Sequence, residues 1–229
     1  MSAVKLTELM KKRQLLSFEL FPPKTDKGMA KLPETIEHLN EFRPDYISVT
    51  YGAGGGNVGA NREVCRMVRE SGTVPVTHFT VIRNTKEGIR DQLETYLSEG
   101  VDHILALRGD FPRGETSTGG DFNYATDLVK FIRQEFGDKF EIAVAGSPEG
   151  HIACRSLDAD IAVLKMKQDN GADYIMTQLC WDMEQFARWQ DKIRKAGVTM
   201  PIDVGIMPIL DQAATINMAF SRNGCVMDR

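Results

Sequence analysis

A glutamate in apolar surroundings stands near the start of the chain, within Ser17-Phe18-Glu19-Leu20-Phe21-Pro22-Pro23. Two prolines end this apolar run, which places Glu19 close to the end of a predicted β-strand. Because desolvation disfavours the charged form of a carboxyl group, Glu19 could stay protonated near neutral pH and donate a proton. A salt-bridged structural glutamate is the alternative interpretation.

Polar residues also follow most of the other apolar runs. They are Thr50 and Tyr51, His78 and Thr80, Arg108 and Asp110, Ser147 and Glu149, and Gln178. A purely structural sheet needs no polar groups at its strand ends, so we interpret the pattern as a functional signal. Gly109 would let the backbone approach a ligand closely. A loop ion pair between Arg108 and Asp110, and a core position for His78, are the structural alternatives.

Seven short runs rich in apolar and β-branched residues predict the strands that position these groups. The runs are Leu15–Phe21, Tyr46–Tyr51, Val74–Val81, His103–Leu107, Glu141–Ala145, Tyr174–Leu179 and Ile202–Met207. Segments with apolar residues at helical spacing lie between them. These are Thr85–Glu99, Asp121–Phe136, Leu157–Asn170 and Met183–Ala196. Strands and helices that alternate in this way indicate parallel strands joined by right-handed crossovers.

The strand-helix rhythm predicts an α/β fold of the (β/α)8 TIM-barrel type, whose enzymes keep their reactive groups at the C-terminal ends of the strands. Gly100, Gly171 and Gly197 each stand where a helix must end through positive φ before the next strand. Only seven strands are visible, so we expect the eighth to be missing from a chain that is short at its C-terminus. Without any linker or Pro-rich hinge, residues 1–229 are predicted to form a single barrel domain.

Composition narrows the classes of function. The 229 residues are 42% hydrophobic and 26% charged with a net charge of -4, which gives no field that would attract nucleic acid or an anionic membrane. No window approaches the roughly 18 apolar residues of a membrane helix, and no signal peptide is visible, so we expect a cytoplasmic protein. The cysteines, Cys65, Cys154, Cys180 and Cys225, are too scattered for a metal site, and we expect free thiols.

The segment Gly54-Gly55-Gly56-Asn57-Val58-Gly59 fits the G-x-G-x-x-G pattern of dinucleotide-binding folds. The acidic residue expected about 20 residues later is missing, because that region reads His78-Phe79-Thr80-Val81-Ile82-Arg83. A glycine-rich barrel loop explains the segment equally well. A nicotinamide dehydrogenase of the Rossmann type is therefore kept only as an alternative.

Taken together, the chain resembles the methylenetetrahydrofolate reductase family over nearly its whole length. The motifs that support the resemblance are Ser17-Phe18-Glu19-Leu20-Phe21-Pro22-Pro23, Ser48-Val49-Thr50-Tyr51-Gly52-Ala53, His78-Phe79-Thr80, Ala106-Leu107-Arg108-Gly109-Asp110, Asn123-Tyr124-Ala125-Thr126-Asp127-Leu128, Pro148-Glu149-Gly150-His151, Gly171-Ala172-Asp173 with Thr177-Gln178, and Gly205-Ile206-Met207-Pro208-Ile209. No single motif is decisive, but their order and spacing make the set specific.

The resemblance implies a flavin-dependent oxidoreductase that uses NAD(P)H to reduce 5,10-methylenetetrahydrofolate to 5-methyltetrahydrofolate, in one-carbon metabolism and methionine biosynthesis. The expected cofactor is FAD, with FMN as the alternative. The resemblance also implies catalytic roles for Glu19, as general acid toward the folate, and for Asp110, near the flavin and folate rings. Gln178 would bind the folate substrate together with these two residues.

The flavin contacts that the resemblance implies come from several strand ends and loops. They are Thr50, His78, Arg108, Gly109, Asp110, Tyr124, His151, Asp160 and Lys167. We expect a homo-oligomer or a partner subunit. A non-catalytic subunit that binds folate or flavin and is completed by a partner protein is the alternative to the enzyme.

Overall fold

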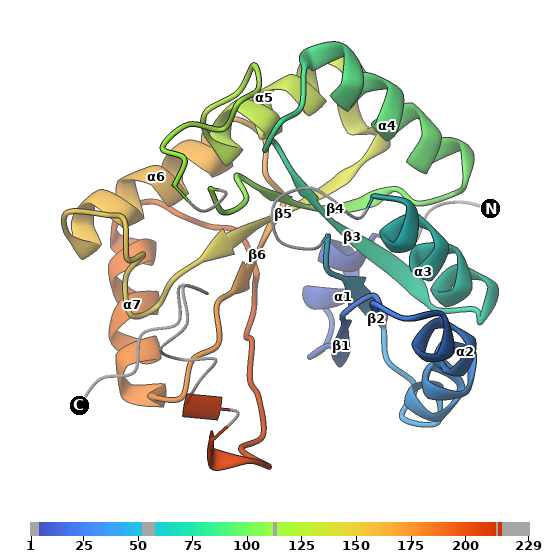
Figure 1. The fold of residues 1–229 in the computed structure, drawn as a ribbon. Helices are drawn as coiled ribbons and strands as arrows, with labels where there is room; N and C mark the ends of the chain where they lie inside the picture. The colour runs from blue at the N-terminus through green and yellow to red at the C-terminus, as the bar shows by residue number, and fades with distance from the viewer. Residues whose placement is uncertain (1–4, 52–57, 112–113, 214, 217–229) are drawn as a thin grey trace. The chain divides into compact units, whose positions relative to one another are not determined.

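A computed structural model of the chain describes residues 5–51, 58–111, 114–213 and 215–216 (Figure 1). Its strands are β1 Ser17–Leu20, β2 Tyr46–Val49, β3 Val74–Thr80, β4 His103–Leu107, β5 Glu141–Gly146, β6 Tyr174–Thr177 and β7 Ile202–Asp203. Its helices are α1 Leu6–Met10, α2 Asp26–Asn40, α3 Val58–Glu70, α4 Lys86–Ser98, α5 Ala125–Phe136, α6 Leu157–Asp169 and α7 Met183–Lys195, with a 3-10 turn at Gly137–Lys139.

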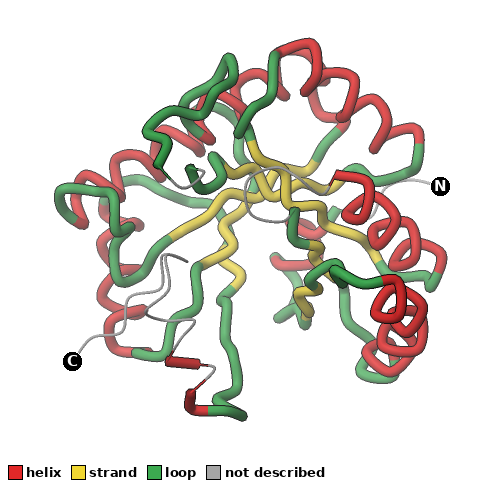
Figure 2. The backbone as a smooth tube through the Cα atoms, viewed as in Figure 1, coloured by secondary structure: helices red, strands yellow, loops and turns green. Residues whose placement is uncertain are grey.

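The described strands form one sheet whose spatial order follows the chain, from β1 to β7. The pairs β1 with β2, β2 with β3, β3 with β4, and β6 with β7 are parallel. Strands and helices alternate along the chain (Figure 2). The predicted α/β fold of the barrel type is therefore confirmed, with seven strands among the described residues. A sequential order also excludes the doubly wound Rossmann sheet, in which the order reverses at a switch point.

The chain divides into two compact units, Met1–Ala143 and Val144–Arg229. The organisation of the chain as a single domain stays a prediction. The first unit contains α1 to α5 and β1 to β4, together with the first residues of β5. The second contains the end of β5, then α6, β6, α7 and β7.

In the first unit, α3 packs against β2 and β3, and α5 packs against β4 (Figure 1). Alternate residues of a strand point to opposite faces, and on β3 the side chain of Phe79 points to the helices. Its ring stacks at an angle with Tyr51 and meets the edge of Tyr96 on α4. Both faces of β2 and β3 are covered, so nearly every residue of the two strands is buried.

The N-terminal ends of β4 and β5 are joined to α1 by a polar cluster. The carboxylate of Glu141 accepts hydrogen bonds from the backbone N–H of Leu6, at 2.7 Å, and of Thr7, at 3.0 Å. Its Oε2 also lies 3.1 Å from Nε2 of His103, whose Nδ1 lies 2.7 Å from Oδ1 of Asp102. We call Asp102, His103, Glu141 and the first turn of α1 the floor cluster. Leu6 beside it is fully buried.

The second unit is built on β6 with α6 and α7, which contact each other. Trp189 of α7 is buried and approaches Gly146, where a Cβ would come within 2.6 Å of the Ile175 side chain. The predicted strand Ile202–Met207 is too long, since β7 ends at Asp203. Beyond it the backbone N–H of Gly205 donates to the side-chain Oγ1 of Thr177, at 2.9 Å, while the Gly205 carbonyl accepts from the Cys180 N–H at 3.1 Å.

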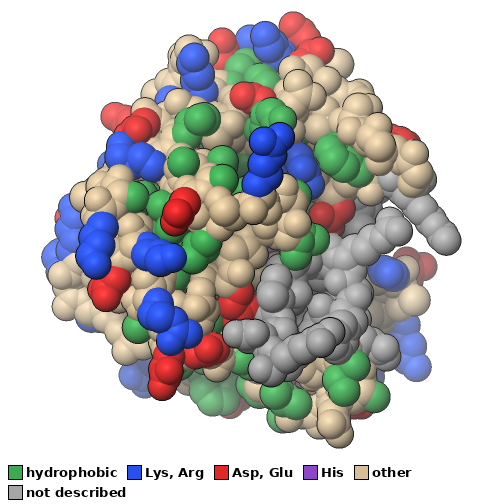
Figure 3. Space-filling view, turned by 90° about the vertical axis from the view of Figure 1, so that its left-hand side faces the viewer, with side chains coloured by type: hydrophobic (Ala, Val, Ile, Leu, Met, Phe, Trp, Pro, Cys, Tyr) green, Lys and Arg blue, Asp and Glu red, His purple; other side chains and the backbone are tan. Residues whose placement is uncertain are grey.

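No helix among the described residues is long and apolar enough to cross a membrane. Over the face drawn in Figure 3, Lys and Arg side chains are interspersed with Asp and Glu side chains. Within the described ranges, no group of three or more His, Cys, Asp or Glu side chains is arranged to hold a metal ion. Cys65, Cys154 and Cys180 form no disulfide, and Cys225 lies outside the described residues.

Candidate functional site

Glu19 and His78 come together from β1 and β3. Glu19 is in register with Ser48 of β2, which is in register with Val76 of β3, so all three lie in one row across the sheet. His78 lies one pleat further toward the carboxyl end, on the same face. Oε2 of Glu19 is 3.5 Å from Nε2 of His78. This pairing places a carboxyl group and an imidazole on the inner face near the strand ends.

The two groups differ in exposure and in protonation. The side chain of Glu19 is 46% exposed and that of His78 only 10%. Partial burial raises the pKa of Glu19, while burial lowers the pKa of His78 to about 4. At neutral pH the imidazole is therefore uncharged, and it cannot hold Glu19 ionised by charge attraction. Glu19 is less enclosed than its apolar sequence neighbours suggest, but the direction of its pKa shift favours the protonated form.

Two polar atoms on this face of β3 are buried without a hydrogen-bond partner, Nε2 of His78 and Oγ1 of Thr80. An unsatisfied buried polar group costs about 1–3 kcal/mol, and such groups are characteristic of sites that complete their bonds with a ligand. They are two residues apart on one strand and so point the same way. The pair provides hydrogen-bonding capacity beside Glu19.

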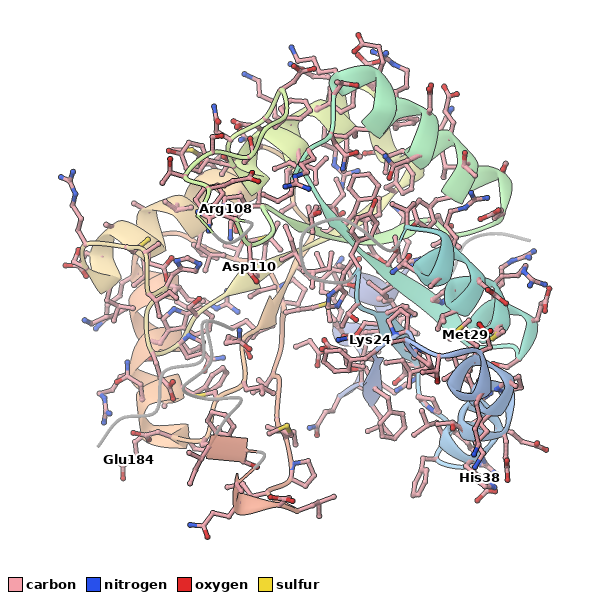
Figure 4. The ribbon with its side chains drawn as sticks, in the orientation of Figure 1. Lys24, Met29, His38, Arg108, Asp110 and Glu184 are labelled. Carbon is pink, nitrogen blue, oxygen red and sulfur yellow. The ribbon has the colours of Figure 1, made fainter. Side chains whose placement is uncertain are left out.

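The loop after β4 presents Arg108, Gly109 and Asp110, and Figure 4 shows Arg108 and Asp110 leaving the same segment. Nε of Arg108 donates to the Gly109 carbonyl at 3.1 Å, and its guanidinium lies 4.4 Å from the ring centre of Phe111. Asp110 is exposed. Within the described part of the chain, Arg108 makes no ion pair with Asp110, so the structural alternative of a loop ion pair is wrong.

Gly109 is a position where only glycine fits. Its φ is +86°, and a Cβ there would lie 2.7 Å from Cγ1 of Ile82 and 3.0 Å from Cβ of Thr80. The backbone of this loop therefore lies directly against the end of β3. The carbonyl of Arg108 accepts a bond from the Val81 N–H at 3.3 Å, which fixes the approach.

The loops after β3 and β4 are bonded to each other further along as well. The bonds run from Arg83 N–H to the Thr118 carbonyl, from Asp121 N–H to the Asn84 carbonyl, and from Lys86 N–H to the Asp121 carboxylate. An ion pair joins Arg83 to Glu115. These bonds tie the loops after β3 and β4 to each other.

Thr50 and Tyr124 complete the predicted residues of the first unit. Thr50 is half-buried just past β2, and its N–H donates to the Leu20 carbonyl at 2.9 Å. Tyr124 precedes α5 with 63% of its surface exposed. Its N–H donates at 3.0 Å to Asp127, which caps the start of the helix. The ring of Tyr124 is thus available at the surface.

In the second unit, Asp160 of α6 organises the loop after β5. One carboxylate oxygen accepts from the His151 N–H at 3.2 Å, and the other lies 3.5 Å from Sγ of Cys154. Lys167, near the end of the same helix, donates to the Ala145 carbonyl at 2.8 Å. Burial lowers the pKa of Lys167, and the nearby charge of Asp160 opposes that shift. The structure therefore brings His151, Asp160 and Lys167 into one neighbourhood.

Gln178 follows β6 and is half-buried. Its N–H donates to the Gly146 carbonyl at 2.8 Å, and its side-chain oxygen accepts from the Leu179 N–H at 2.9 Å. These bonds fix the position of Gln178 just beyond the end of β6. In the glycine-rich segment Gly54–Gly59, residues 54–57 lie outside the described residues, and Gly59 belongs to α3.

Sequence reasoning did not single out Asn61, which is buried at the start of α3 and bonded to the end of β2. A weak signal existed, because asparagine is a poor helix former and sits at the start of a helical pattern. The sequence did not indicate the floor cluster either, because Glu141 is far in sequence from Asp102 and His103.

The family model of methylenetetrahydrofolate reductase matches residues 5–222. The chain belongs to this family. The methylenetetrahydrofolate reductase 1 of Schizosaccharomyces pombe is 39% identical over 203 residues, which are 87% of this chain and 34% of that protein. The 5,10-methylenetetrahydrofolate reductase of Salmonella typhimurium is 37% identical over 195 residues, 85% of this chain and 64% of that protein. The chain thus spans about a third of the fungal reductase and less than two thirds of the bacterial one.

Solved structures that resemble this reductase-family chain support the fold. A Clostridium thermocellum protein that binds two copies of 5-methyl-5,6,7,8-tetrahydrofolic acid matches with a TM-score of 0.67 at 14% identity, over 98% of this chain and 77% of that one. A phosphonopyruvate hydrolase matches with a TM-score of 0.64 at 11% identity, over 93% of this chain and 76% of that one. At such identities the likeness concerns the fold alone.

Proposed function

We propose that the chain reduces 5,10-methylenetetrahydrofolate to 5-methyltetrahydrofolate, with electrons that NAD(P)H delivers through a bound flavin. Membership of the methylenetetrahydrofolate reductase family supports the reaction. The observation on which the proposal rests is the Glu19–His78 pair, in which a carboxyl with a raised pKa stands 3.5 Å from a buried imidazole. A raised pKa increases the protonated fraction of the Glu19 carboxyl group, and this suits acid catalysis.

Glu19 is proposed as the general acid that protonates a folate nitrogen, so that the ring carrying the methylene group opens before the carbon is reduced. Its exposure of 46% leaves the carboxyl accessible to a ligand. His78 stays neutral next to it, because burial lowers its pKa to about 4. A cationic imidazole would lower the pKa of Glu19 and weaken it as a proton store.

Flavin, when bound, supplies hydride transfer between the nicotinamide and the folate. The residues proposed to hold it are Thr50, His78, Arg108, Gly109, Asp110, Tyr124, His151, Asp160 and Lys167. The first unit fits such a group, because His78 and Thr80 have unsatisfied polar atoms and Gly109 leaves room for close backbone approach. FAD is the proposed form and FMN the alternative.

Asp110 and Gln178 are proposed to bind the folate. Asp110 is exposed at the end of the loop after β4, where its carboxylate would lie near the reacting rings and tune the flavin by its charge. Gln178 follows β6, its side-chain oxygen accepts from the Leu179 N–H at 2.9 Å, and a carboxamide is the type of group that can hydrogen-bond a pterin. The folate bound by the C. thermocellum protein of similar fold is consistent with this class of ligand.

The proposal further includes the cytoplasm as the place of the reaction and a homo-oligomer or a partner subunit as the working assembly. Size-exclusion chromatography with light scattering tests the assembly. A monomer that catalyses the full reaction would contradict that part alone.

The decisive experiment is the absorption spectrum of the purified protein before and after anaerobic NADH or NADPH. A flavin spectrum that bleaches with the nicotinamide and recovers with methylenetetrahydrofolate is the expected result. A colourless protein that cannot be reconstituted with FAD or FMN would overturn the proposal. Flavin binding without bleaching would instead favour a non-catalytic subunit.

A further inference from the structure

Asn61 is a fully buried amide at the start of α3. Its Nδ2 donates to two successive carbonyls at the end of β2, Val49 at 3.0 Å and Thr50 at 3.1 Å. Its Oδ1 accepts from the hydroxyl of Thr77 on β3 at 2.8 Å and from that of Tyr96 on α4 at 2.6 Å. Both amide hydrogens and both oxygen lone pairs are therefore used.

This side chain joins three elements at one point behind the sheet. A buried polar network in which every group is satisfied specifies a single geometry, whereas a partly satisfied one is costly. Asparagine has no advantage as a helix residue at this position. Its presence is explained by the four bonds and by the geometry that they impose on β2 and β3.

The bonded groups adjoin residues of the candidate site. Thr50 itself is a proposed flavin contact, and its carbonyl is one of the two that Asn61 holds. Thr77 immediately precedes His78, and the two side chains point to opposite faces of β3. Asn61 thus holds the carboxyl ends of β2 and β3 from the helix-covered face of the sheet. The opposite face of β3 carries His78 and, two residues further on, Thr80.

We propose that Asn61 is the positioning residue that sets Thr50 and His78 in register for flavin binding. The inference rests on the proposed function, because it assigns Asn61 a part in holding the flavin. Asn61 acts through Thr50 and Thr77.

The test uses Asn61→Asp, which keeps the size of the side chain but turns an oxygen toward the Val49 and Thr50 carbonyls. Repulsion there should displace the end of β2, while the other oxygen still accepts from Thr77 and Tyr96. We expect the Kd of the variant for flavin to be at least about tenfold higher than that of the wild type. Fluorescence titration of the apoprotein with FAD and FMN measures it. The visible spectrum of the remaining bound flavin should shift as well.

Asn40→Asp is the matched control. Asn40 ends α2 and also bridges two elements, accepting from the Thr73 hydroxyl at 2.8 Å and donating to the Ser71 carbonyl at 3.5 Å. These contacts lie before β3 begins, away from its carboxyl end. Asn40→Asp should lower the melting temperature yet leave the flavin Kd within about twofold. If Asn61→Asp does not fold, Asn61→Ala introduces no charge and should still raise the Kd about threefold.

The inference is overturned if both Asn61 variants fold and keep the wild-type Kd, or if Asn40→Asp weakens flavin binding as much as Asn61→Asp. Failure of the proposed function looks different, since the wild-type protein would then take up neither flavin. That result would remove the inference together with the function on which it rests.

Discussion

His78 and His103 stand on neighbouring strands and on the same face of the sheet, but their surroundings are opposite. His103 begins β4 between the carboxylates of Asp102 and Glu141. Burial disfavours its charge, but the hydrogen bonds to both carboxylates prevail and raise its pKa to about 9. His78 lies near the carboxyl end of β3, where burial without such partners lowers its pKa to about 4. One ring is cationic at neutral pH and the other is neutral.

The difference separates a structural end of the strands from the end where the catalytic residues are proposed. At the floor cluster, every charge has a partner, and Glu141 in addition accepts from the N–H groups that begin α1. At the other end, Nε2 of His78 and Oγ1 of Thr80 are buried without hydrogen bonds. Unsatisfied buried groups cost stability, and the proposed flavin would provide hydrogen bonds to them.

The largest effect is expected from Glu19→Gln at the proposed catalytic end. An amide of the same shape cannot donate the proton, so the rate of methylenetetrahydrofolate reduction should fall by about 10²–10⁴-fold. Reduction of the flavin by NAD(P)H should stay within about twofold, because no proton from Glu19 is needed in that half-reaction. Stopped-flow absorbance measures both half-reactions. Equal loss of the two would show that the acid role is wrong.

Glu141→Gln should weaken the floor cluster by about 3 kcal/mol, since it breaks a buried charged pair that also anchors α1. The free energy of unfolding by urea measures the loss, and the flavin Kd should not change. Glu135→Gln is the matched control, because its ion pair with Arg90 is 36% exposed on both sides. Such a surface pair should cost less than about 1 kcal/mol. Equal costs would contradict the structural role of the floor cluster.

The two histidines should give opposite pH dependence of stability. The contribution of His103 is complete below its unfolded pKa of 6.5 and is lost as the pH rises through about 9. That of neutral His78 is complete above 6.5 and is lost as the pH falls through about 4. Over its full pH range, each of these contributions to the free energy of unfolding amounts to about 3 kcal/mol at most.

Urea unfolding between about pH 4 and pH 9 measures these slopes. His103→Gln should flatten the alkaline side of the curve, and His78→Gln should flatten the acid side below 6.5. Below 4.5, protonation of Glu141 adds a further loss, because bonds from His103, Thr7 and Leu6 outweigh its burial and hold its pKa at about 2. Curves that respond alike to the two substitutions would remove the comparison.

The smallest effect is expected from Gly109→Ala. Here φ is +86° and the new Cβ would meet Ile82 and Thr80, so we expect a loss of about 1–3 kcal/mol and weaker flavin binding. Gly114→Ala is the control, with a φ of +87° and no atom within 4 Å of the new Cβ. It should show the backbone strain of about 1 kcal/mol alone. Thermal unfolding compares the two, and indistinguishable variants would show that the contact with β3 is unimportant.

Much of the fold is predictable from sequence, because periodicity reports burial. The strand His103–Leu107 is as predicted, and α4, α6 and α7 differ from prediction by a residue or two at their ends. The predicted strand is too long beyond Asp203, where the Gly205 N–H donates to the Thr177 hydroxyl instead of to a backbone carbonyl. Helix α2 was not predicted, since its residues are mostly polar and exposed.

The site is predictable only in part. Strand ends indicate Glu19, His78 and Arg108 to Asp110, because parallel strands bring their carboxyl ends together. Whether His78 is charged depends on what lies within a few ångströms in space, and sequence does not give that. Asn61 escapes for the same reason, as its partners Val49, Thr77 and Tyr96 are separated by up to 35 residues from it.

The bonds from Leu6 and Thr7 to Glu141 also constrain how the chain can be made. The N–H of Leu6 is 135 residues from its acceptor, the carboxylate of Glu141. Helix α1 therefore leaves the ribosome long before Glu141 does. Contacts of such sequence separation close late and slow folding. Helix α1 therefore cannot form its bonds to Glu141 until synthesis has passed residue 141, and only then can the first unit be completed.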